Sequence, residues 1–315
     1  MHRLAIVIVN YKTPVLVSQL LGHLSEQVDP AQDVVMVVDN CSGDGSADTI
    51  KAEILRRGWG EWANVLRSAV NDGFSAGNNL GMRSCDARLY LLMNSDTYPR
   101  PGAIAELLRA AERSPDYGLL GPRLEDEDGS VQVSAFRFQT PLAEVDQAIA
   151  LAPLSRLLRA YSVSVAPSDT SERADWLSFA CILIRREVLE AAGYMDDGYF
   201  MYFEDDDFCR MAAEHGYWCL RWPAARVVHL RGKSSPVKRL TAARARLPAY
   251  YYESRSRYFI KWHGVLGWVL PNLAWQLGTM LDLFRRCIPG RTGRVPAWRF
   301  IDVWRVGSRQ RNSPS

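Results

Sequence analysis

The sequence predicts an α/β fold: a doubly wound, mostly parallel β-sheet with helices on both faces, followed by a helical C-terminal extension. Short β-branched runs alternate with segments of helical period along the first 120 residues, which is typical of strand–helix–strand units. The first run, residues 4–9, is apolar throughout, as expected of a strand that helices cover on both faces. A change of composition near residue 231 marks the start of the extension.

The expected elements follow this alternation in chain order. Strands are predicted at residues 4–9, 34–38, 65–66, 89–93 and 119–120, and helices at 15–28, 46–57, 75–85 and 102–113. Further elements are a hairpin strand at 131–138, strands at 176–184, 218–222 and 226–229, and helices at 186–192, 204–215 and 238–262. Pro248 should break the last helix, because proline removes a backbone hydrogen bond. Residues 140–172 show no clear pattern, and we expect them to be mobile or to face an acceptor.

The composition is that of a globular protein. With 48% apolar and 23% charged residues over 315 positions, the chain is neither disordered nor collagen-like. Its six cysteines are scattered, without the paired spacing of a zinc site. The first strand begins without the charged and cleavable segments of a signal peptide, so we expect a cytoplasmic location.

Charge is divided unevenly along the chain. Residues 1–230 carry 21 Lys and Arg against 32 Asp and Glu, whereas residues 231–315 carry 17 against 3. A basic, Trp-rich end indicates contact with an anionic surface, either a bilayer or a substrate that bears a pyrophosphate. Nucleic acid is disfavoured as a partner, because no signature of a nucleic-acid-binding fold accompanies the charge.

The segment 265–284 is apolar but holds too many polar residues for a transmembrane helix. We predict an amphipathic anchor that lies in the plane of the membrane, with Trp268 and Trp275 at headgroup depth. Residues 264–311, which include Trp298, should then bind anionic bilayers. The alternative is a helix that packs on the domain or on a second copy of the chain, which would give a homo-oligomer.

Polar residues follow the first two predicted strands. Asn10 and Tyr11 end the first, and Asp39 ends the second. The carboxyl ends of such strands form the ligand crevice of a doubly wound sheet. A carboxylate and an aromatic ring at this edge are suited to bind a pyrimidine base. Alternatively, Asp39 caps the helix that starts near Ser46. Residues 10–14 lack the glycine patterns that bind dinucleotides or form a P-loop, which disfavours both classes.

A Gly-rich turn leads into the third helix. The run that begins at Asn71 contains Gly73, Phe74, Gly77 and Asn78. Glycines let the backbone approach a ligand closely, and a helix N-terminus favours negative charge, so the run suits a nucleotide diphosphate. A plain turn with Asn caps is the alternative for any three of these residues.

Asn94 and Asp96 follow the apolar strand 89–93 directly. A carboxylate at the end of such a strand suits Mg²⁺ or Mn²⁺, which take oxygen ligands and bridge substrate phosphates. The alternative is that Asp96 only caps the helix at 102–113.

Four successive carboxylates, residues 204–207, follow an aromatic run. Their crowding should raise the pKa of at least one, which would suit a general base, although a solvated helix start is the alternative. His229 ends a short strand beside glycine and basic residues. It is either a metal or diphosphate ligand or a structural histidine.

In this order the motifs resemble family 2 glycosyltransferases of the GT-A fold, a Rossmann-like architecture, and particularly the bacterial rhamnosyl- and galactofuranosyltransferase branch. The resemblance covers about residues 4–262 and rests on Ile8–Tyr11, Val38–Ser46, Asn71–Gly81, Asn94–Asp96, Gly193–Asp196, Phe203–Asp207 and His229. Asn94 departs from the Asp-x-Asp form of the metal motif. The run Tyr251–Phe259 resembles the post-catalytic helix of rhamnosyltransferases.

The resemblance implies a role for each candidate residue. Asp205 would be the general base, Asp96 and His229 would hold the metal, and Asp39 would contact the uracil or thymine. The donor-binding set is Asn10, Tyr11, Asp39, Asn71, Gly73, Phe74, Gly77, Asn78, Asn94 and Asp96, and the acceptor-side set is Trp176 and Glu204.

The implied activity is inverting transfer of a sugar by a single displacement, with Mg²⁺ or Mn²⁺ as cofactor. The expected donor is dTDP-rhamnose, with a UDP-linked hexose or galactofuranose as the alternative, and the acceptor a saccharide, free or linked to a polyprenyl diphosphate. Such an enzyme would work in cell-surface polysaccharide synthesis at the inner face of the membrane.

We expect a catalytic domain at residues 1–235, with a donor half to about 125 and an acceptor half from about 126, and an extension at 236–315. A nucleotidyltransferase or pyrophosphatase would need a phosphate-gripping loop that residues 10–14 lack. A non-catalytic adaptor that binds a sugar nucleotide in a membrane assembly stays open as a further class.

Overall fold

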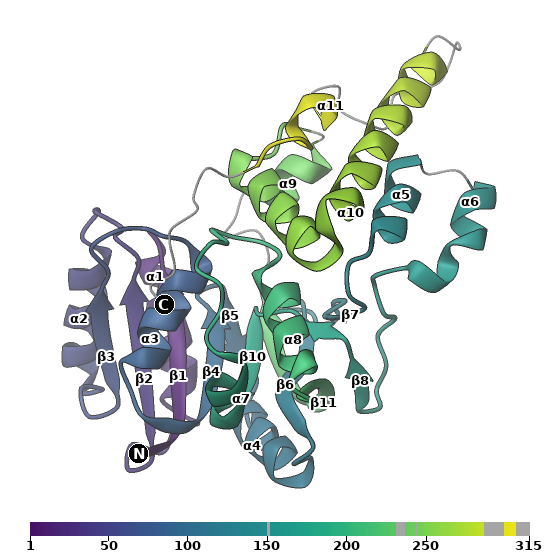
Figure 1. Cartoon of the computed structure of the whole chain (residues 1–315). Coiled ribbons are helices and arrows are strands. Elements are labelled where there is room, and N and C mark those ends of the chain that lie inside the picture. The colour runs from purple at the N-terminus through teal and green to yellow at the C-terminus, as the bar shows by residue number, and fades with distance from the viewer. Residues whose placement is uncertain (150–151, 231–236, 244, 287–298, 307–315) are drawn as a thin grey trace. The chain divides into compact units, whose positions relative to one another are not determined.

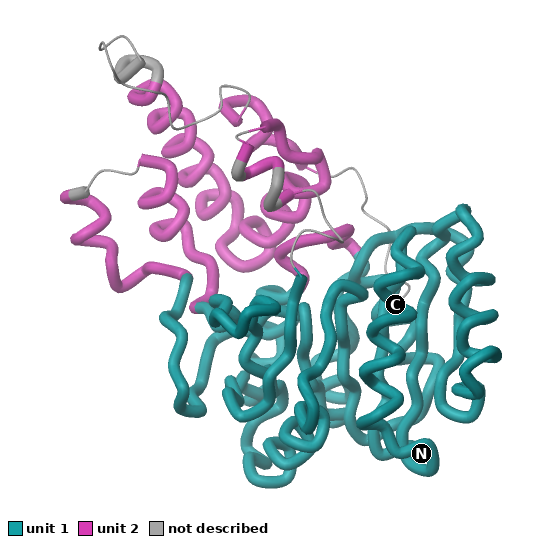
Figure 2. The backbone as a smooth tube through the Cα atoms, turned by 180° about the vertical axis from the view of Figure 1, so that it is seen from behind, with its two compact units in different colours: residues 1–136, 164–197, 205–234 teal, residues 137–163, 198–204, 235–315 magenta. Residues whose placement is uncertain are grey.

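The computed structural model describes residues 1–149, 152–230, 237–243, 245–286 and 299–306. These fall into two compact units (Figure 2). Unit 1 comprises residues 1–136, 164–197 and 205–234, and unit 2 comprises residues 137–163, 198–204 and 235–315. Unit 2 therefore adds two earlier segments to the extension that the sequence places from residue 236 onward.

Unit 1 is built around one large sheet (Figure 1). The sheet contains β1 (His2–Asn10), β2 (Asp33–Asp39), β3 (Ala63–Arg67), β4 (Ala87–Asn94), β5 (Thr97–Pro99), β6 (Tyr117–Glu125), β8 (Glu172–Ala174), β10 (Cys181–Arg185) and β11 (Trp218–His229). Its helices are α1 (Pro14–Leu24), α2 (Ser46–Arg57), α3 (Phe74–Arg83), α4 (Ala103–Arg113), α7 (Arg186–Ala192) and α8 (Glu204–Glu214), whose first residue belongs to unit 2.

The strand order is β3-β2-β1-β4-β10-β6-β11-β5, and β8 pairs with β11. Strands β3, β2, β1 and β4 are parallel to one another, and β6 is parallel to β11, whereas β10 runs antiparallel between β4 and β6. The predicted α/β fold with a mostly parallel sheet is confirmed. Every antiparallel pair of this sheet includes β10 or β11, which belong to the second half, where the sequence alternation is weakest.

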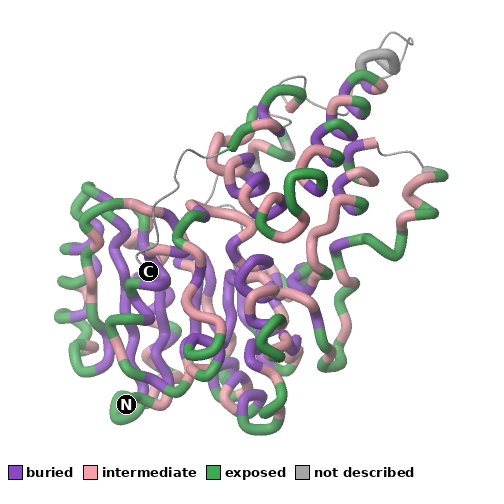
Figure 3. Tube along the Cα trace, viewed as in Figure 1, coloured by how far each residue is buried: buried purple, intermediate pink, exposed green. Residues whose placement is uncertain are grey.

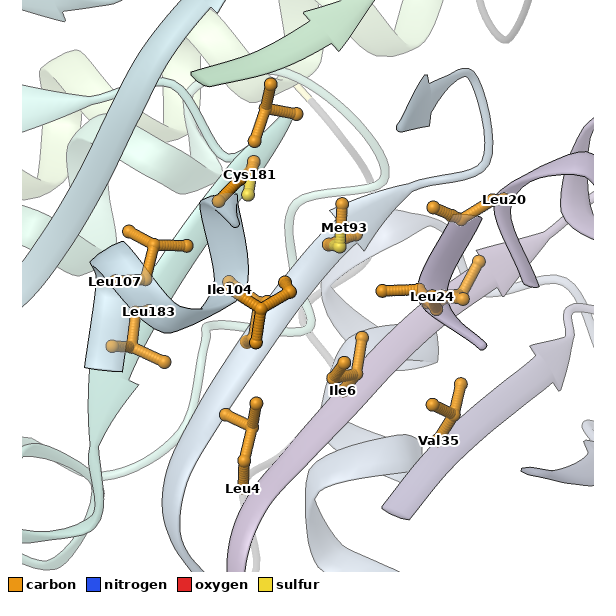
Figure 4. Close-up of a cluster of buried hydrophobic side chains, with 14 of the residues drawn as sticks. Leu4, Ile6, Leu20, Leu24, Val35, Met93, Ile104, Leu107, Cys181 and Leu183 are labelled. Carbon is orange, nitrogen blue, oxygen red and sulfur yellow. The ribbon is translucent and has the colours of Figure 1, made fainter. Parts of the chain in front are cut away.

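Helices cover both faces of the sheet, which explains why β1 is apolar throughout. Alternate residues of β1 face α1, α2 and α4 in the largest core cluster, part of which Figure 4 shows around Leu4 and Ile6. The intervening residues face α3, where a Cβ on Gly81 would lie 2.3 Å from Cγ1 of Val7. The lack of a side chain at this glycine lets α3 pack close to the sheet.

Four predicted strands differ in detail from the structure. The segment 176–184 divides into β9 (Trp176–Leu177) and β10. The expected hairpin strand at 131–138 contributes only β7 (Ala135–Phe136), which pairs with β9 in a small second sheet. Conversely, 218–222 and 226–229 form the single strand β11, with a register shift between them.

Unit 2 consists of helices, and some of them lie in the segment 140–172, where the sequence shows no clear pattern. That this segment is mobile or faces an acceptor stays a prediction. The segment forms α5 (Pro141–Ile149), α6 (Ala152–Leu157) and a 3-10 turn at Arg159–Tyr161. The other helices of the unit are α9 (Val237–Ala242), α10 (Ala249–Arg286) and α11 (Arg299–Asp302). The helical break expected at Pro248 lies between α9 and α10. Helix α5 packs along α10, so the face that it buries is formed by residues about a hundred positions later.

Helix α10 changes direction at Gly264, whose φ of 66° lies in the left-handed region that favours glycine. Among the described residues, no helix combines the length and the hydrophobicity needed to cross a bilayer. Pro271 lies within the second arm of the helix.

The core of unit 2 holds a buried polar cluster. The guanidinium of Arg255 donates to Oε2 of Glu144 at 2.9 Å and to Oδ1 of Asn272 at 2.7 Å. The indole of Trp275 donates to the same Glu144 oxygen at 2.7 Å. Burial alone would raise the pKa of Glu144, but the charge of Arg255 and its hydrogen bonds lower it below the ordinary value.

This cluster corrects the expected position of Trp275. Trp275 is buried, and Trp268 is partly buried, with its indole donating to Ser256 and its ring against Trp304. The prediction that Trp275 lies at headgroup depth is therefore wrong, because its side chain is buried in the unit. For Trp268, which is only partly buried, it stays a prediction. Trp298 lies outside the described residues.

Candidate active site

The carboxyl ends of β1 and β2 lie side by side, because the two strands pair in register with Asn10 opposite Asp39. The Asn10 amide donates to Oδ1 of Asp39 at 2.7 Å, and the Ser42 hydroxyl donates to the same oxygen at 2.6 Å. The Ser42 backbone N–H donates to Oδ2 at 3.2 Å. These bonds fix the orientation of a carboxylate that is almost fully buried.

Asp39 does not cap the following helix. The backbone N–H of Ser46 donates instead to Asp44 at 3.0 Å, and the N-cap of α2 is Gly45. The structure thus removes the capping alternative and leaves Asp39 at the edge of the sheet. Tyr11, the aromatic candidate beside it, is 46% exposed.

A chain of hydroxyl groups joins the ends of β1 and β4. The Thr13 hydroxyl is within hydrogen-bond distance of Oδ1 of Asn10, at 3.1 Å, and of the hydroxyl of Ser95, at 3.0 Å. Sequence reasoning missed Thr13, Ser42 and Ser95 as members of the site. Their signal was weak, since a hydroxyl one to three residues beyond a strand end is common and the partners lie up to 82 positions apart.

The Gly-rich run is held against the first two strands. The Asn40 amide donates to Oδ1 of Asn71 and to the carbonyl of Gly73, both at 2.9 Å. A Cβ on Gly77 would lie 3.0 Å from Cγ1 of Val9. Close packing of α3 on β1 therefore requires this glycine, whether or not a ligand approaches it.

Two other residues of the run have different surroundings. The Asn78 amide is buried and donates to the carbonyl of Phe74 within α3. Phe74, the first residue of the helix, is only partly buried. The buried Ser75 hydroxyl has no hydrogen-bond partner among the described residues.

Asp96 and His229 come together at the ends of two neighbouring strands. β5 begins directly after Asp96 and pairs with the end of β11, with Thr97 opposite His229. Nε2 of His229 lies 3.7 Å from Oδ1 of Asp96, and both side chains are buried. Asp96 does not cap α4, whose N-cap is Gly102 without a side-chain cap.

The donor set at this position suits a hard divalent cation. A carboxylate and an imidazole converge there, and Oδ1 of nearby Asn94 is buried without a hydrogen-bond partner among the described residues. No group of three or more His, Cys, Asp or Glu that could hold a metal occurs in the described part of the chain. A site with few protein ligands matches Mg²⁺ and Mn²⁺, which commonly take their remaining ligands from water and substrate phosphates.

Asp205 lies near the same strand ends. Its carboxylate accepts a hydrogen bond from the backbone of Phe179, and the neighbouring carbonyl of Ala180 accepts the backbone N–H of Asn94 at 3.0 Å. Burial raises the pKa of Asp205 to about 6, against the lowering effect of the backbone N–H groups around it. A carboxylate with this pKa is ionised at neutral pH and basic enough to take a proton.

The backbone before Asp205 has an unusual conformation. Tyr202 and Phe203 both have positive φ, at 73° and 68°. The other non-glycine residues of positive φ in the described chain are Lys12 and Cys41, which follow the ends of β1 and β2. Such conformations cost of order 1–3 kcal/mol each and cluster at functional sites, so all four support the candidate residues beside them.

The acceptor-side candidates have structural contacts. Trp176 stacks on Phe136 across the small sheet, with ring centroids 4.1 Å apart. Glu204 is the first residue of α8 and is buried. The structure therefore brings Asn10, Asp39 and the Asn71 run together at one part of the sheet edge, and Asp96 and His229 at another.

A model of the glycosyltransferase-like family 2 matches residues 2–247. The chain belongs to this family. This family 2 glycosyltransferase is 29% identical over 283 residues to the N-acetylglucosaminyl-diphospho-decaprenol L-rhamnosyltransferase of Mycobacterium tuberculosis, covering 85% of this chain and 89% of the relative. It is also 27% identical to the low-salt glycan biosynthesis hexosyltransferase Agl10 of Haloferax volcanii, covering 66% of this chain and 61% of that protein.

The fold of this glycosyltransferase is found in solved structures. The mannosyltransferase PcManGT from Pyrobaculum calidifontis, in complex with GDP-Man and Mn²⁺, has a TM-score of 0.58 at 14% identity and covers 92% of this chain and 76% of its own. GalNAc-T7 with UDP, GalNAc and Mn²⁺ has a TM-score of 0.55 at 14% identity, with 82% and 51% covered. These similarities confirm the expected GT-A fold.

Proposed function

We propose that the protein is a metal-dependent, inverting transferase that moves L-rhamnose from dTDP-rhamnose to a saccharide linked to a polyprenyl diphosphate. The observation that carries the metal-dependent reaction is the approach of His229 to Asp96, 3.7 Å apart at the end of the sheet. The sugar and the lipid-linked acceptor are supported by the similarity over 85% of the chain to a rhamnosyltransferase named for such an acceptor.

In this reaction Asp96 and His229 would hold Mg²⁺ or Mn²⁺, with Asn94 as a further oxygen ligand. The bound cation would neutralise the charge that develops on the leaving diphosphate. Asp39, fixed by Asn10 and Ser42, would orient the base of the nucleotide. Donor binding thus depends on side chains that the strand ends already hold in place.

Asp205 would act as the general base. It would remove the proton from the acceptor hydroxyl as that oxygen attacks the anomeric carbon and the bond to the diphosphate breaks. Because the attack and the departure occur in one displacement on opposite sides of the carbon, the configuration at that carbon inverts.

A UDP-linked hexose is the second candidate donor. The similarity to a hexosyltransferase over 66% of the chain favours it. Uracil and thymine differ by one methyl group, and a carboxylate such as Asp39 would accept a hydrogen bond from the ring N–H of either.

The two donors can be separated by ligand-dependent thermal stability. Selective binding of dTDP-rhamnose with Mn²⁺ should raise the melting temperature more than UDP-glucose, UDP-galactofuranose or GDP-mannose does, since a ligand stabilises the state it binds. Asp96→Asn should remove the Mn²⁺-dependent part of the shift, whereas Glu53→Gln on the exposed side of α2 should not. A larger rise in melting temperature with a UDP-sugar would favour the UDP-sugar as the donor.

A polyprenyl-linked acceptor also implies a place at the inner face of the cell membrane. The excess of 17 basic over 3 acidic residues in 231–315 supports a peripheral association with anionic lipid.

A further inference from the structure

The second arm of α10, which starts after the kink at Gly264, has its polar and apolar residues reversed relative to a solvent-exposed helix. Asn272, Thr279 and Asp282 are each at most 3% exposed. Asn272 bonds Arg255 in the core of unit 2. The helix therefore directs its hydrogen-bonding residues inward.

Apolar side chains face outward along the same arm. The α10 stripe consists of Val265, Leu266, Leu270, Leu273, Leu277 and Met280, each between 49% and 76% exposed. From Leu266 onward their spacing of three or four residues places them on one face of the helix over roughly 20 Å. Figure 3 shows exposed and buried positions alternating along this helix. An aliphatic surface of this length is unusual on a protein that has only water as its neighbour.

The charge around the stripe indicates what covers it. Of the three acidic residues in 231–315, Asp282 and Asp302 are buried, and Asp302 is paired with Arg246 and Arg305. Lys261 is exposed one turn before the stripe. The extension is thus strongly basic in sequence, with 17 basic against 3 acidic residues, and its described part presents an apolar face.

We propose that the α10 stripe inserts into the headgroup boundary of an anionic bilayer and orients the protein on the membrane. Burial of aliphatic side chains and attraction of basic residues to anionic lipid act together in such interfacial helices. A second copy of the chain is a poorer partner, because two extensions of the same charge would meet. The proposal rests on the proposed membrane location but not on the identity of the donor sugar.

The test is sedimentation of the full chain with phosphatidylglycerol vesicles at low salt. Leu266→Gln with Leu273→Gln should weaken vesicle partitioning by about tenfold or more, since each removes an aliphatic side chain from the lipid. The matched control, Leu55→Gln with Leu157→Gln, changes two exposed leucines outside the stripe, at 69% and 77%, and should stay within about twofold of the parent. Thermal melting should be the same for all three proteins.

Three results would overturn the proposal. The first is that the unaltered protein fails to bind the vesicles, and the second is that the stripe variant binds as well as the control. The third is that the unaltered protein is a dimer that the stripe variant dissociates while neither binds lipid. Transfer of rhamnose to a detergent-solubilised saccharide linked to a polyprenyl diphosphate is measured separately. Absence of this transfer in a protein that still binds vesicles would refute the proposed reaction but not the proposed lipid-binding surface.

Discussion

Among single residues, Asp205 is the one whose removal should affect turnover most selectively. Asp205→Asn keeps the shape of the side chain but removes its basicity, so transfer should fall by a factor of about 10²–10⁴. Donor affinity should hardly change, because the proposed donor-binding residues Asp39 and Asp96 lie at strand ends, whereas Asp205 lies in α8. The measurement is turnover together with donor affinity, and Glu204→Gln and Asp207→Asn are the controls. If one of the controls lost turnover while Asp205→Asn kept it, the base would be that residue.

The pH dependence of transfer provides a second test at this carboxylate. Because burial raises the pKa of Asp205 to about 6, the base becomes protonated as the pH falls below 6. The rate constant kcat/KM should then fall about tenfold for each further pH unit. An ordinary aspartate would keep its activity down to about pH 4, so a profile that is flat between pH 7 and 5 would contradict the assignment.

The raised pKa of Asp205, which suits it to act as a base, lowers the stability of the folded protein at neutral pH. The folded protein binds a proton at Asp205 at a higher pH than the unfolded chain does, so ionisation of this group destabilises the fold above about pH 6. As the pH falls through 6 toward the unfolded value of 3.8, this cost disappears. Asp205→Asn should therefore raise the melting temperature at pH 8 but not at pH 4, in contrast to its effect on turnover. Equal melting curves for both proteins at pH 8 would argue against a raised pKa.

At the level of elements, the contact of α3 with β1 separates two explanations for the glycines of α3: room for a ligand, or close packing on the sheet. The sequence suggests that Gly77 and Gly81 allow a ligand to approach, but the structure shows that both lie against valines of β1. Gly81→Ala would place a methyl group 2.3 Å from the present position of Val7 Cγ1, and a β-branched side chain in a strand cannot easily move. We expect a loss of about 1–3 kcal/mol in the free energy of unfolding.

The control for this prediction is Gly60→Ala. Gly60 has no heavy atom within 4 Å of an added Cβ, and its φ is not positive. The substitution should leave stability unchanged or increase it slightly. Urea unfolding of the two variants measures the difference, and equal stability would show that α3 can move away from the sheet at no cost.

The elements that could be predicted from the sequence are those whose pattern is local. β1, β2 and β4 are apolar runs between helices, and each ends next to a polar residue that becomes part of the candidate site. β10 is also apolar, but its antiparallel direction depends on a return of the chain from unit 2, which no local pattern encodes. The helix α5 was missed because its buried face includes Glu144, an acidic residue that Arg255, 111 positions later, pairs with in the core.

At the scale of the whole molecule, the division into two units depends on such distant contacts. Sequence reasoning expected the extension to begin at residue 236, since charge changes there. The structure adds 137–163 and 198–204 to the same unit. Contacts such as His263 with the carbonyl of Gln139 join these segments. The run Tyr251–Phe259, first recognised as a family feature, thus supplies part of the core of unit 2.

The integrity of unit 2 should therefore depend on Arg255. Arg255→Met leaves Glu144 charged and buried, with Trp275 as its remaining side-chain donor among the described residues, and breaking a buried pair in this way costs about 3–5 kcal/mol. Because the pKa of Glu144 is lowered in the folded state, the pair contributes stability at neutral pH and loses it as the pH falls through that lowered pKa. Arg255→Met with Glu144→Leu removes both charges and should recover most of the loss. The stability of the two variants is compared by calorimetric unfolding at pH 7. If the double variant were no more stable than Arg255→Met, the arginine would act through packing rather than through its charge.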